Sequence, residues 1–551
     1  MGQVNAHPQS YEAFMSALQN RFDQALGDGL ISPFIFPHDF GPIFILILTL
    51  LIKIPGSGPL KFINYLSFGC ISYLSILNIS RVRMLSGGTG NMIGVMFTYQ
   101  IVLSASLLLF NNPRRDFKRI ERSTIFQRIE EIPGGSRPIM KTSVSALQND
   151  GRSDSSLKLR STLDQAAEIT APSRSATGKP QEMFILRWQG YPNTFSHRLS
   201  WVMDLTQNFR GAGWNWRIRT APKVPGPVSK QLDRSLHGVS KPEVTSPEDT
   251  YAFTQAIISH VAVSYMALDI LRVLVKIDPY FWGVVSSPPP PPLNSLGTFT
   301  NTATQAYRVL VTALAVTAAV SFQSSAITLL TILISTYIPS IRTWTLTPTE
   351  APWMYPPTFG PFSATLDHGL RGFWGQSWHQ LFRFTFTQPG IWLTAHLPHP
   401  LRKPLIKRTI HLTTAFAISG LVHATGSYTQ VPSTTNPTHV FLLFILQVPA
   451  ILFQTLVAEH VIPRLPFQPP RWLRRLTNLL FALVVAFFTG PLGADDFAKG
   501  GMWLVEPVPV SFVRGLGFGR VEGERWWWLW GAKWLRLWRG ERWWEVGVWI
   551  L

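Results

Sequence analysis

The chain has 551 residues, of which 46% are hydrophobic and only 14% are charged, with a net charge of +19. A soluble domain carries about 25% charged residues, so the composition excludes an ordinary soluble protein and predicts a polytopic membrane protein. Lysine and arginine lie mostly in loops between apolar runs, which is typical of loops that face an anionic membrane surface and argues against a nucleic-acid partner. The single cysteine excludes a multi-cysteine metal site, and no metal is expected.

The first part of the chain, residues 1–112, contains three predicted membrane spans. A helix needs about 20 apolar residues to cross the hydrocarbon core. Three runs come near this length, at residues 40–54, 62–79 and 92–110. They follow one another closely, so we expect them to pack as neighbours.

The next part, residues 113–250, changes character. Residues 113–182 are rich in Ser, Arg, Lys and Pro and show no sustained apolar period, which predicts a basic, disordered loop. Residues 183–250 mix tryptophans such as Trp201 and Trp214 with arginines such as Arg198 and Arg210. Tryptophan with arginine suits the headgroup layer, and we expect interfacial helices here.

The remaining spans belong to a predicted membrane core, residues 251–500. They lie at 252–275, 309–341, 405–424, 440–461 and 476–492. The run 309–341 is long enough for two short spans or one tilted helix, so the total is eight to nine. Residues 366–387 read as an interfacial amphipathic segment, Asp495 and Asp496 as a solvated loop, and residues 501–551 as a Trp-rich interfacial tail. The predicted fold is an all-α transmembrane helix bundle.

His423 is the first candidate catalytic residue. It stands in Ser419-Gly420-Leu421-Val422-His423-Ala424, deep in the span 405–424. An ionisable residue inside a membrane helix marks a candidate functional site, and an imidazole suits general-base catalysis. The alternative is a histidine bonded to a neighbouring helix, with the nearby glycines present only for packing. His411, nearer the basic end of the span, is expected to be structural.

His379 is the second candidate. It lies in Phe373-Trp374-Gly375-Gln376-Ser377-Trp378-His379-Gln380, an aromatic segment. Its alternative reading is an amphipathic histidine at the membrane interface. Neither histidine is decisive by itself.

Five short elements in order along the chain resemble the wax-synthase-like branch of the membrane-bound O-acyltransferase family. The segment around His379 resembles that branch's FWGRRWHQ-type element, with Gln376 and Ser377 where the branch often has two arginines. The segment around His423 is similar to its SG-x-x-H-x element. The other three elements are Asn208-Phe209-Arg210-Gly211-Ala212-Gly213-Trp214-Asn215-Trp216, Tyr355-Pro356-Pro357-Thr358-Phe359-Gly360 and Phe488-Thr489-Gly490-Pro491-Leu492.

The resemblance implies an enzyme that uses an acyl-CoA co-substrate and an apolar alcohol, with no permanently bound cofactor. It implies that His423 is the general base and that His379 orients the thioester or stabilises the oxyanion. Arg371, Arg383 and Arg408, with Lys403, are candidates for the coenzyme A phosphates. Their alternative is that they are ordinary positive anchors at the membrane surface.

Fungal members of this kind acetylate terpenoid or meroterpenoid alcohols, so the resemblance implies an acetyl-CoA-dependent acetyltransferase of secondary metabolism, in contact with membrane lipid in the endoplasmic reticulum. One alternative is a synthase of long-chain wax or sterol esters. The non-enzyme alternative is a proton-coupled transporter, although the sequence lacks the paired, broken-helix repeats typical of that class.

Overall fold

The structure, a computed structural model, describes residues 11–53, 62–85, 88, 90–130, 139–143, 181–234, 247–349, 351–431, 435–519, 525–527, 535–540 and 546–550. These residues form two compact units. The first unit comprises Met1–Asn111, Ser259–Ser325 and Thr358–Leu551, and the second comprises Asn112–Ile258 and Ala326–Pro357. Both candidate histidines belong to the first unit.

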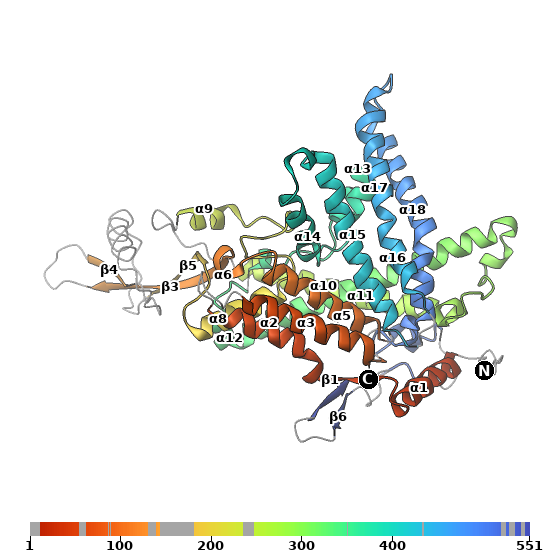
Figure 1. Ribbon diagram of the computed structural model, residues 1–551, viewed down its shortest axis with the longest axis horizontal. Coiled ribbons are helices and arrows are strands. Elements are labelled where there is room, and N and C mark those ends of the chain that lie inside the picture. The colour runs from red at the N-terminus through yellow and green to blue at the C-terminus, as the bar shows by residue number, and fades with distance from the viewer. Residues whose placement is uncertain are drawn as a thin grey trace. The chain divides into compact units, whose positions relative to one another are not determined.

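Helices dominate the first unit (Figure 1). Their bounds are α1 Tyr11–Gly27, α2 Gly41–Leu51, α3 Phe62–Arg81, α5 Asn91–Leu108, α13 Ser363–Gly372, α14 Arg383–Ala395, α15 Pro404–Tyr428, α16 Pro437–Ile445, α17 Gln447–Leu456, α18 Arg471–Lys499 and α19 Phe512–Gly515. Two further helices, α10 Pro247–Ile277 and α11 Thr300–Tyr337, have residues in both units. The helical membrane bundle predicted from the sequence is confirmed.

Six helical segments of the described chain are long and apolar enough to cross a membrane. They are Phe62–Arg81, Asn91–Leu108, Asp249–Ile277, Gly297–Tyr337, Pro437–Arg464 and Arg471–Lys499. Two predicted spans are not among the six. Helix α2 has only 11 residues, and basic, hydroxyl and glycine residues lower the hydropathy of α15. The run 309–341 forms the single helix α11 and not two short spans.

A small sheet joins the two ends of the first unit. Strand β1 (Ser32–Phe36) pairs in parallel with β2 (Val82–Arg83) and antiparallel with β7 (Val546–Ile550), which in turn pairs with β6 (Leu535–Arg539). In this register Phe34 faces Ile550 across the sheet. The tail was expected to lie at the membrane interface, but its last described residues are strands paired with the N-terminal region.

The second unit contains a three-stranded antiparallel sheet in the order β4-β3-β5. Its elements are α6 Pro113–Asp116, β3 Arg119–Glu130, β4 Ile139–Ser143, β5 Gln181–Gln189, α8 Phe195–Gln207, α9 Gly226–Arg234 and α12 Pro339–Thr345. The prediction of a disordered loop at residues 113–182 is therefore corrected at both ends of that range. Strand β3 near its start and strand β5 at its end pair with each other. Residues 131–138 and 144–180 of that prediction lie outside the described residues.

The Trp/Arg-rich segment 183–250 is only partly helical. Trp201 of α8 and Trp214 are 0% and 2% exposed, with ring centroids 4.9 Å apart. The fully buried Arg119 guanidinium lies beside them and donates to Gln189 Oε1 at 2.6 Å. These two tryptophans are core residues of the second unit, so they are not available to a lipid interface as we expected. Residues 235–246 lie outside the described residues.

Helix α15 is packed between α5, α14 and α16, and α16 packs on α18 (Figure 1). The contact with α5 is close because Gly94 and Thr98 present little bulk. The Thr98 and Thr425 hydroxyls lie 2.7 Å apart, and the Gly94 amide donates to Thr429 Oγ1 at 3.0 Å. Small and hydroxyl-bearing residues are the usual means of close helix association in membranes. This packing holds the part of α15 that carries His423.

Candidate active site

His423 lies close to the C-terminal end of the unbroken helix α15. Near the other end of α15, Arg408 donates to Glu459 Oε1 and to Thr455 Oγ1, both at 2.9 Å. At a rise of about 1.5 Å per residue, His423 is roughly 22 Å farther along the helix axis than Arg408. The basic end of α15 and the imidazole are therefore separated by most of the helix length.

The His423 ring stacks face to face on Phe444 of α16. The ring centroids are 4.6 Å apart and the planes deviate from parallel by 7°. Within the described part of the chain, the imidazole has no hydrogen bond to protein, and the side chain is only partly buried. Phe444 thus sets the plane of the ring without occupying either nitrogen, which leaves both nitrogens for a substrate.

The glycines near His423 are packing residues. A β-carbon at Gly420 would lie 2.9 Å from the Phe441 ring, and one at Gly426 would lie 2.9 Å from the Asn91 side chain. Both positions therefore serve close helix approach. The alternative for His423, a hydrogen bond to a neighbouring helix, is absent from the described structure.

The segment that carries His379 is an irregular turn and not a continuous amphipathic helix. Residues Phe373–Ser377 form one turn of π-helix, and Trp378 is extended. Gln380 Nε2 donates to the Trp378 carbonyl at 2.8 Å, while Arg383 Nη1 donates to the Gly375 carbonyl at 2.5 Å and to Gln380 Oε1 at 2.6 Å. Single π-helical turns are uncommon and occur often at functional sites.

His379 lies within a group of aromatic rings. Its ring centroid is 5.2 Å from that of Trp378, 6.0 Å from Phe382 and 6.1 Å from Phe359. Phe359 comes from the Tyr355–Gly360 element of the sequence, so two of the five motif elements meet at this histidine. The side chain is half-buried among these rings.

The two histidines belong to one aromatic cluster, which consists of Phe359, His379, Trp378, Trp374, Phe444 and His423. The links are Trp378 to Trp374, with centroids 6.0 Å apart, and Trp374 to Phe444, at 5.9 Å. The two imidazoles do not contact each other directly. Segments about forty residues apart in sequence are thus brought to the two ends of a continuous series of rings.

A buried polar chain supports Trp374, the ring at the centre of the cluster. Trp374 Nε1 donates to Gln447 Oε1 at 3.0 Å, and Gln447 Nε2 donates to Thr489 Oγ1 at 3.1 Å. Thr489 belongs to the Phe488–Leu492 element on α18. Buried polar atoms that find partners in this way specify one arrangement of the side chains, so a fourth motif element helps to position the cluster.

The fifth element, Asn208–Trp216, contacts the start of the Tyr355–Gly360 element inside the second unit. Arg210 Nη1 and Nη2 donate to the carbonyls of Pro357 and Pro356, both at 2.5 Å. A β-carbon at Gly213 would lie 2.9 Å from the Met354 side chain. The Asn208–Trp216 element therefore holds the start of the Tyr355–Gly360 element, whose last residues reach His379.

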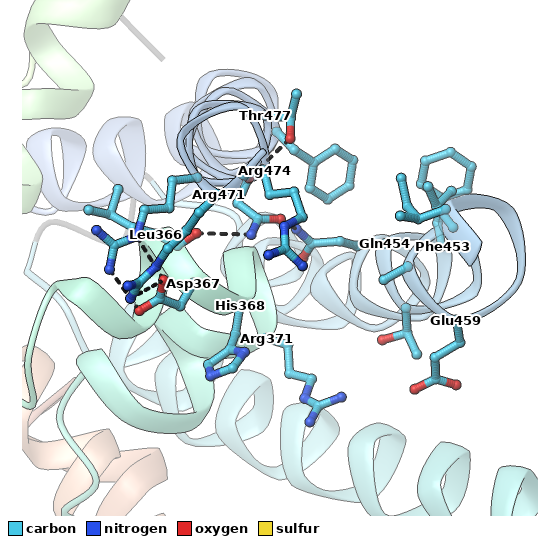
Figure 2. Close-up of a pocket in the computed structure, with 17 residues that line it drawn as sticks. Leu366, Asp367, His368, Arg371, Phe453, Gln454, Glu459, Arg471, Arg474 and Thr477 are labelled. Carbon is cyan, nitrogen blue, oxygen red and sulfur yellow. Dashed lines mark hydrogen bonds and ion pairs between the residues drawn. The ribbon is translucent and has the colours of Figure 1, made fainter. Parts of the chain in front are cut away.

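The three arginines proposed for the coenzyme A phosphates differ in their surroundings. Arg383 is bound within the turn described above, and Arg408 is paired with Glu459. Arg371, on α13, is exposed and lines a pocket of about 540 Å³ between α13, α17 and α18 (Figure 2). Lys403 lies just before α15 and is exposed. Of these four side chains, Arg371 alone lines that pocket.

Asp496 is a buried polar residue near the candidate base that sequence reasoning missed. Its carboxylate accepts from Ser427 Oγ at 2.5 Å, one helical turn beyond His423. The predicted solvated loop at Asp495 and Asp496 is wrong, because both residues belong to α18, which continues through Pro491. Proline is tolerated in membrane helices where neighbouring groups compensate for the lost hydrogen bond.

Among the described residues, no group of three or more His, Cys, Asp or Glu side chains could hold a metal.

The fold and the candidate site together define an integral membrane protein with two histidines on one aromatic cluster. Residues 355–446, which include both histidines, match the model of the membrane bound O-acyl transferase family. The family resemblance inferred from the motifs is confirmed over this segment.

Three curated relatives illustrate the comparison. The O-mevalon transferase macI of Penicillium terrestre is 27% identical over 237 residues, which are 42% of this chain and 46% of the relative. The acetyltransferase eriL of Hericium erinaceus is 30% identical over 29% of this chain and 41% of the relative. The acetyltransferase ataH of Aspergillus terreus is 39% identical over 29% and 52%. The chain thus spans about half the length of these relatives. No solved structure matches.

Proposed function

We propose that the protein is an O-acyltransferase of fungal type that transfers an acetyl group from acetyl-CoA to a hydroxyl of a terpenoid or meroterpenoid intermediate, at the endoplasmic reticulum. The observation that carries the proposal is the state of His423, which is stacked on Phe444 and free of protein hydrogen bonds among the described residues. A ring held in plane with a free nitrogen is suited to remove a proton from an alcohol.

In the proposed reaction, each of the two histidines has its own role. His423 accepts the proton of the acceptor hydroxyl, and the oxygen forms a bond to the thioester carbonyl carbon. His379 donates a hydrogen bond to the oxyanion that develops on that carbonyl. When the carbon–sulfur bond breaks, the His423 imidazolium returns the proton to the thiolate, so that the products are the ester and free coenzyme A.

The names of the relatives favour two candidates for the acyl group that is transferred. The relatives named as acetyltransferases favour acetyl. The relatives named as O-mevalon transferases favour a second candidate, the transfer of a mevalonyl group. A long-chain ester synthase and a proton-coupled transporter remain as the alternatives drawn from the sequence.

A donor panel tests these candidates. Microsomes that contain the protein are incubated with labelled acetyl-, mevalonyl- or palmitoyl-CoA and a set of terpenoid and meroterpenoid alcohols, and ester formation is measured. The proposal expects turnover with acetyl-CoA and none in microsomes that contain His423→Ala at the same level. Turnover with palmitoyl-CoA alone would favour the long-chain synthase, and an absence of turnover with every donor would favour the transporter.

A further inference from the structure

The pocket in Figure 2 lies apart from the aromatic cluster, at the other end of α15. It has a volume of about 540 Å³ and is lined by the end of α13, by α17 with the π-helical turn Val457–Val461, and by the first turns of α18. Volumes of about 300–1,000 Å³ are typical of pockets that bind small-molecule ligands.

The lining of the pocket carries an excess of positive charge. Four arginines, Arg371, Arg471, Arg474 and Arg475, stand against two carboxylates, those of Asp367 and Glu459. An excess of this kind in a concave site favours an anionic ligand, because the cations are held together against their mutual repulsion.

Both carboxylates are already paired. Arg475 donates to Asp367 through Nε at 2.7 Å and through Nη2 at 3.0 Å, and Arg471 lies 3.5 Å from the same carboxylate. The hydrogen bond from Arg475 lowers the pKa of Asp367 to about 2, so the pair is ionised at neutral pH. Glu459 is paired with Arg408 from α15. The other two arginines of the lining form no ion pair with either carboxylate, although one of them adds a longer-range electrostatic attraction to Glu459.

Arg371 and Arg474 are those two arginines. Neither side chain has an ion pair or a hydrogen bond in the described part of the chain. Figure 2 shows them on two sides of the pocket, Arg371 from α13 and Arg474 from α18, whereas Arg471 is turned toward Asp367. Two guanidinium groups that line one pocket from different helices, and form no ion pair or hydrogen bond there, are placed to hold phosphate oxygens.

We propose that this pocket is a phosphate-binding site in which Arg371 and Arg474 bind the phosphate groups of the coenzyme A donor. The identity of the donor rests on the proposed function. The headgroup of an anionic phospholipid offers the same phosphate chemistry and is the other source that the experiment must distinguish.

The location of the pocket suits coenzyme A. Arg408, which shares Glu459 with the pocket, is roughly 22 Å from His423 along α15. Coenzyme A separates its phosphates from its sulfur by an extended pantetheine arm. A phosphate site at one end of α15 and a base at the other therefore match a donor with this geometry.

The cation of the turn that carries His379 is already engaged. Arg383 donates to the Gly375 carbonyl at 2.5 Å and to Gln380 Oε1 at 2.6 Å. Ser377 is buried, where its hydroxyl donates to the Pro361 carbonyl at 2.9 Å and lies 2.9 Å from Thr365 Oγ1. We therefore assign the phosphates to the pocket arginines.

The test measures the binding of free coenzyme A to the full chain in phosphatidylcholine nanodiscs by calorimetry. We expect Arg371→Gln and Arg474→Gln each to weaken binding by about tenfold, the size of one lost charge-assisted hydrogen bond. Arg81→Gln, an exposed arginine at the end of α3, is the matched control and should bind normally. Asp367→Asn releases Arg471 and Arg475 and should tighten binding, a gain that misfolding cannot produce.

A second arm separates the two phosphate sources. In nanodiscs that also contain phosphatidylglycerol, native mass spectrometry reports the lipid retained by each variant. Loss of coenzyme A affinity in the two pocket variants supports the donor as the ligand. Unchanged coenzyme A affinity with loss of retained phosphatidylglycerol would overturn the donor assignment in favour of a lipid headgroup, and no change in either would overturn the site. His423→Ala should bind coenzyme A normally, so failure of catalysis and failure of this site are distinguishable.

Discussion

The imidazole of His423 lies parallel to the ring of Phe444, with a separation of 4.6 Å between centroids. This contact connects α15 to α16 at the position where the candidate base must be held. A histidine that depended on a hydrogen bond for its orientation would give up one nitrogen to the protein. Here the orientation comes from a ring face, so the chemistry of both nitrogens is preserved.

His423→Ala should abolish transfer without loss of the protein. General-base catalysis contributes about 10²–10⁴-fold to rate, so we expect kcat to fall by that factor. His399→Ala, an exposed histidine in the turn before α15, is the control and should keep normal turnover. Near-normal turnover by His423→Ala, with the protein in the membrane at the usual level, would show that another group is the base.

Phe444→Leu should lower kcat while KM for the acyl donor stays the same. Leucine fills part of the same space but cannot stack, and aromatic pairs contribute about 0.5–1.5 kcal/mol beyond their buried area, which corresponds to about a two- to tenfold loss in rate. Phe488→Leu, at a phenylalanine that is 72% exposed, provides the comparison. Equal kcat values for the two variants would contradict a role of the stacked ring in positioning His423.

Arg383→Gln should reduce kcat by about tenfold and leave KM for acetyl-CoA unchanged. Arg383 holds the turn beside His379 through the Gly375 carbonyl and Gln380, and the loss of a hydrogen bond to a charged group costs about 1.5–3 kcal/mol. Steady-state kinetics distinguishes this positioning role from the phosphate-binding role that the family resemblance implied for Arg383. A rise in KM with constant kcat would restore Arg383 as a phosphate ligand.

Gly94→Ala should destabilise the protein, whereas Gly69→Ala should not. A β-carbon at Gly94 would lie 2.0 Å from the Thr425 carbonyl oxygen, so α5 and α15 would have to separate, at a cost of about 1–3 kcal/mol. At Gly69, in the neighbouring helix α3, no atom lies within 4 Å, and alanine should gain about 0.5–1 kcal/mol of helix propensity. Thermal unfolding in detergent would reveal the difference. Equal midpoints would mean that the α5–α15 contact is not tight.

Local patterns predicted the helices well because their signal lies within short stretches of sequence. The apolar runs at α3, α5, α10 and α18 correspond closely to the observed helices. The pairing of β1 with β7 was not predictable in this way, because a strand partner hundreds of residues away leaves no local signal.

The surroundings of individual site residues were not predictable either, because they also depend on contacts between distant segments. Pro491 suggested a helix end near Asp496, but membrane helices tolerate proline, and the carboxylate became a buried partner of Ser427. Arg371 and Arg383 look alike in the sequence, and only the geometry shows that one is bound in a turn and the other lines an open pocket. The role of an arginine is decided by what surrounds its guanidinium, which the chain alone does not display.

The pairing of β1 with β7 also has a consequence for biosynthesis. Ribosomes add about 5–20 residues per second, so β1 emerges tens of seconds before the strand that covers its edge. During that interval an edge that contains Phe34 and Ile35 has no β7 to pair with. An unpaired edge can pair with other chains and cause aggregation. We therefore expect the yield from a host cell to depend on the supply of chaperones during translation. It should also depend on whether an affinity tag is placed beside residue 550.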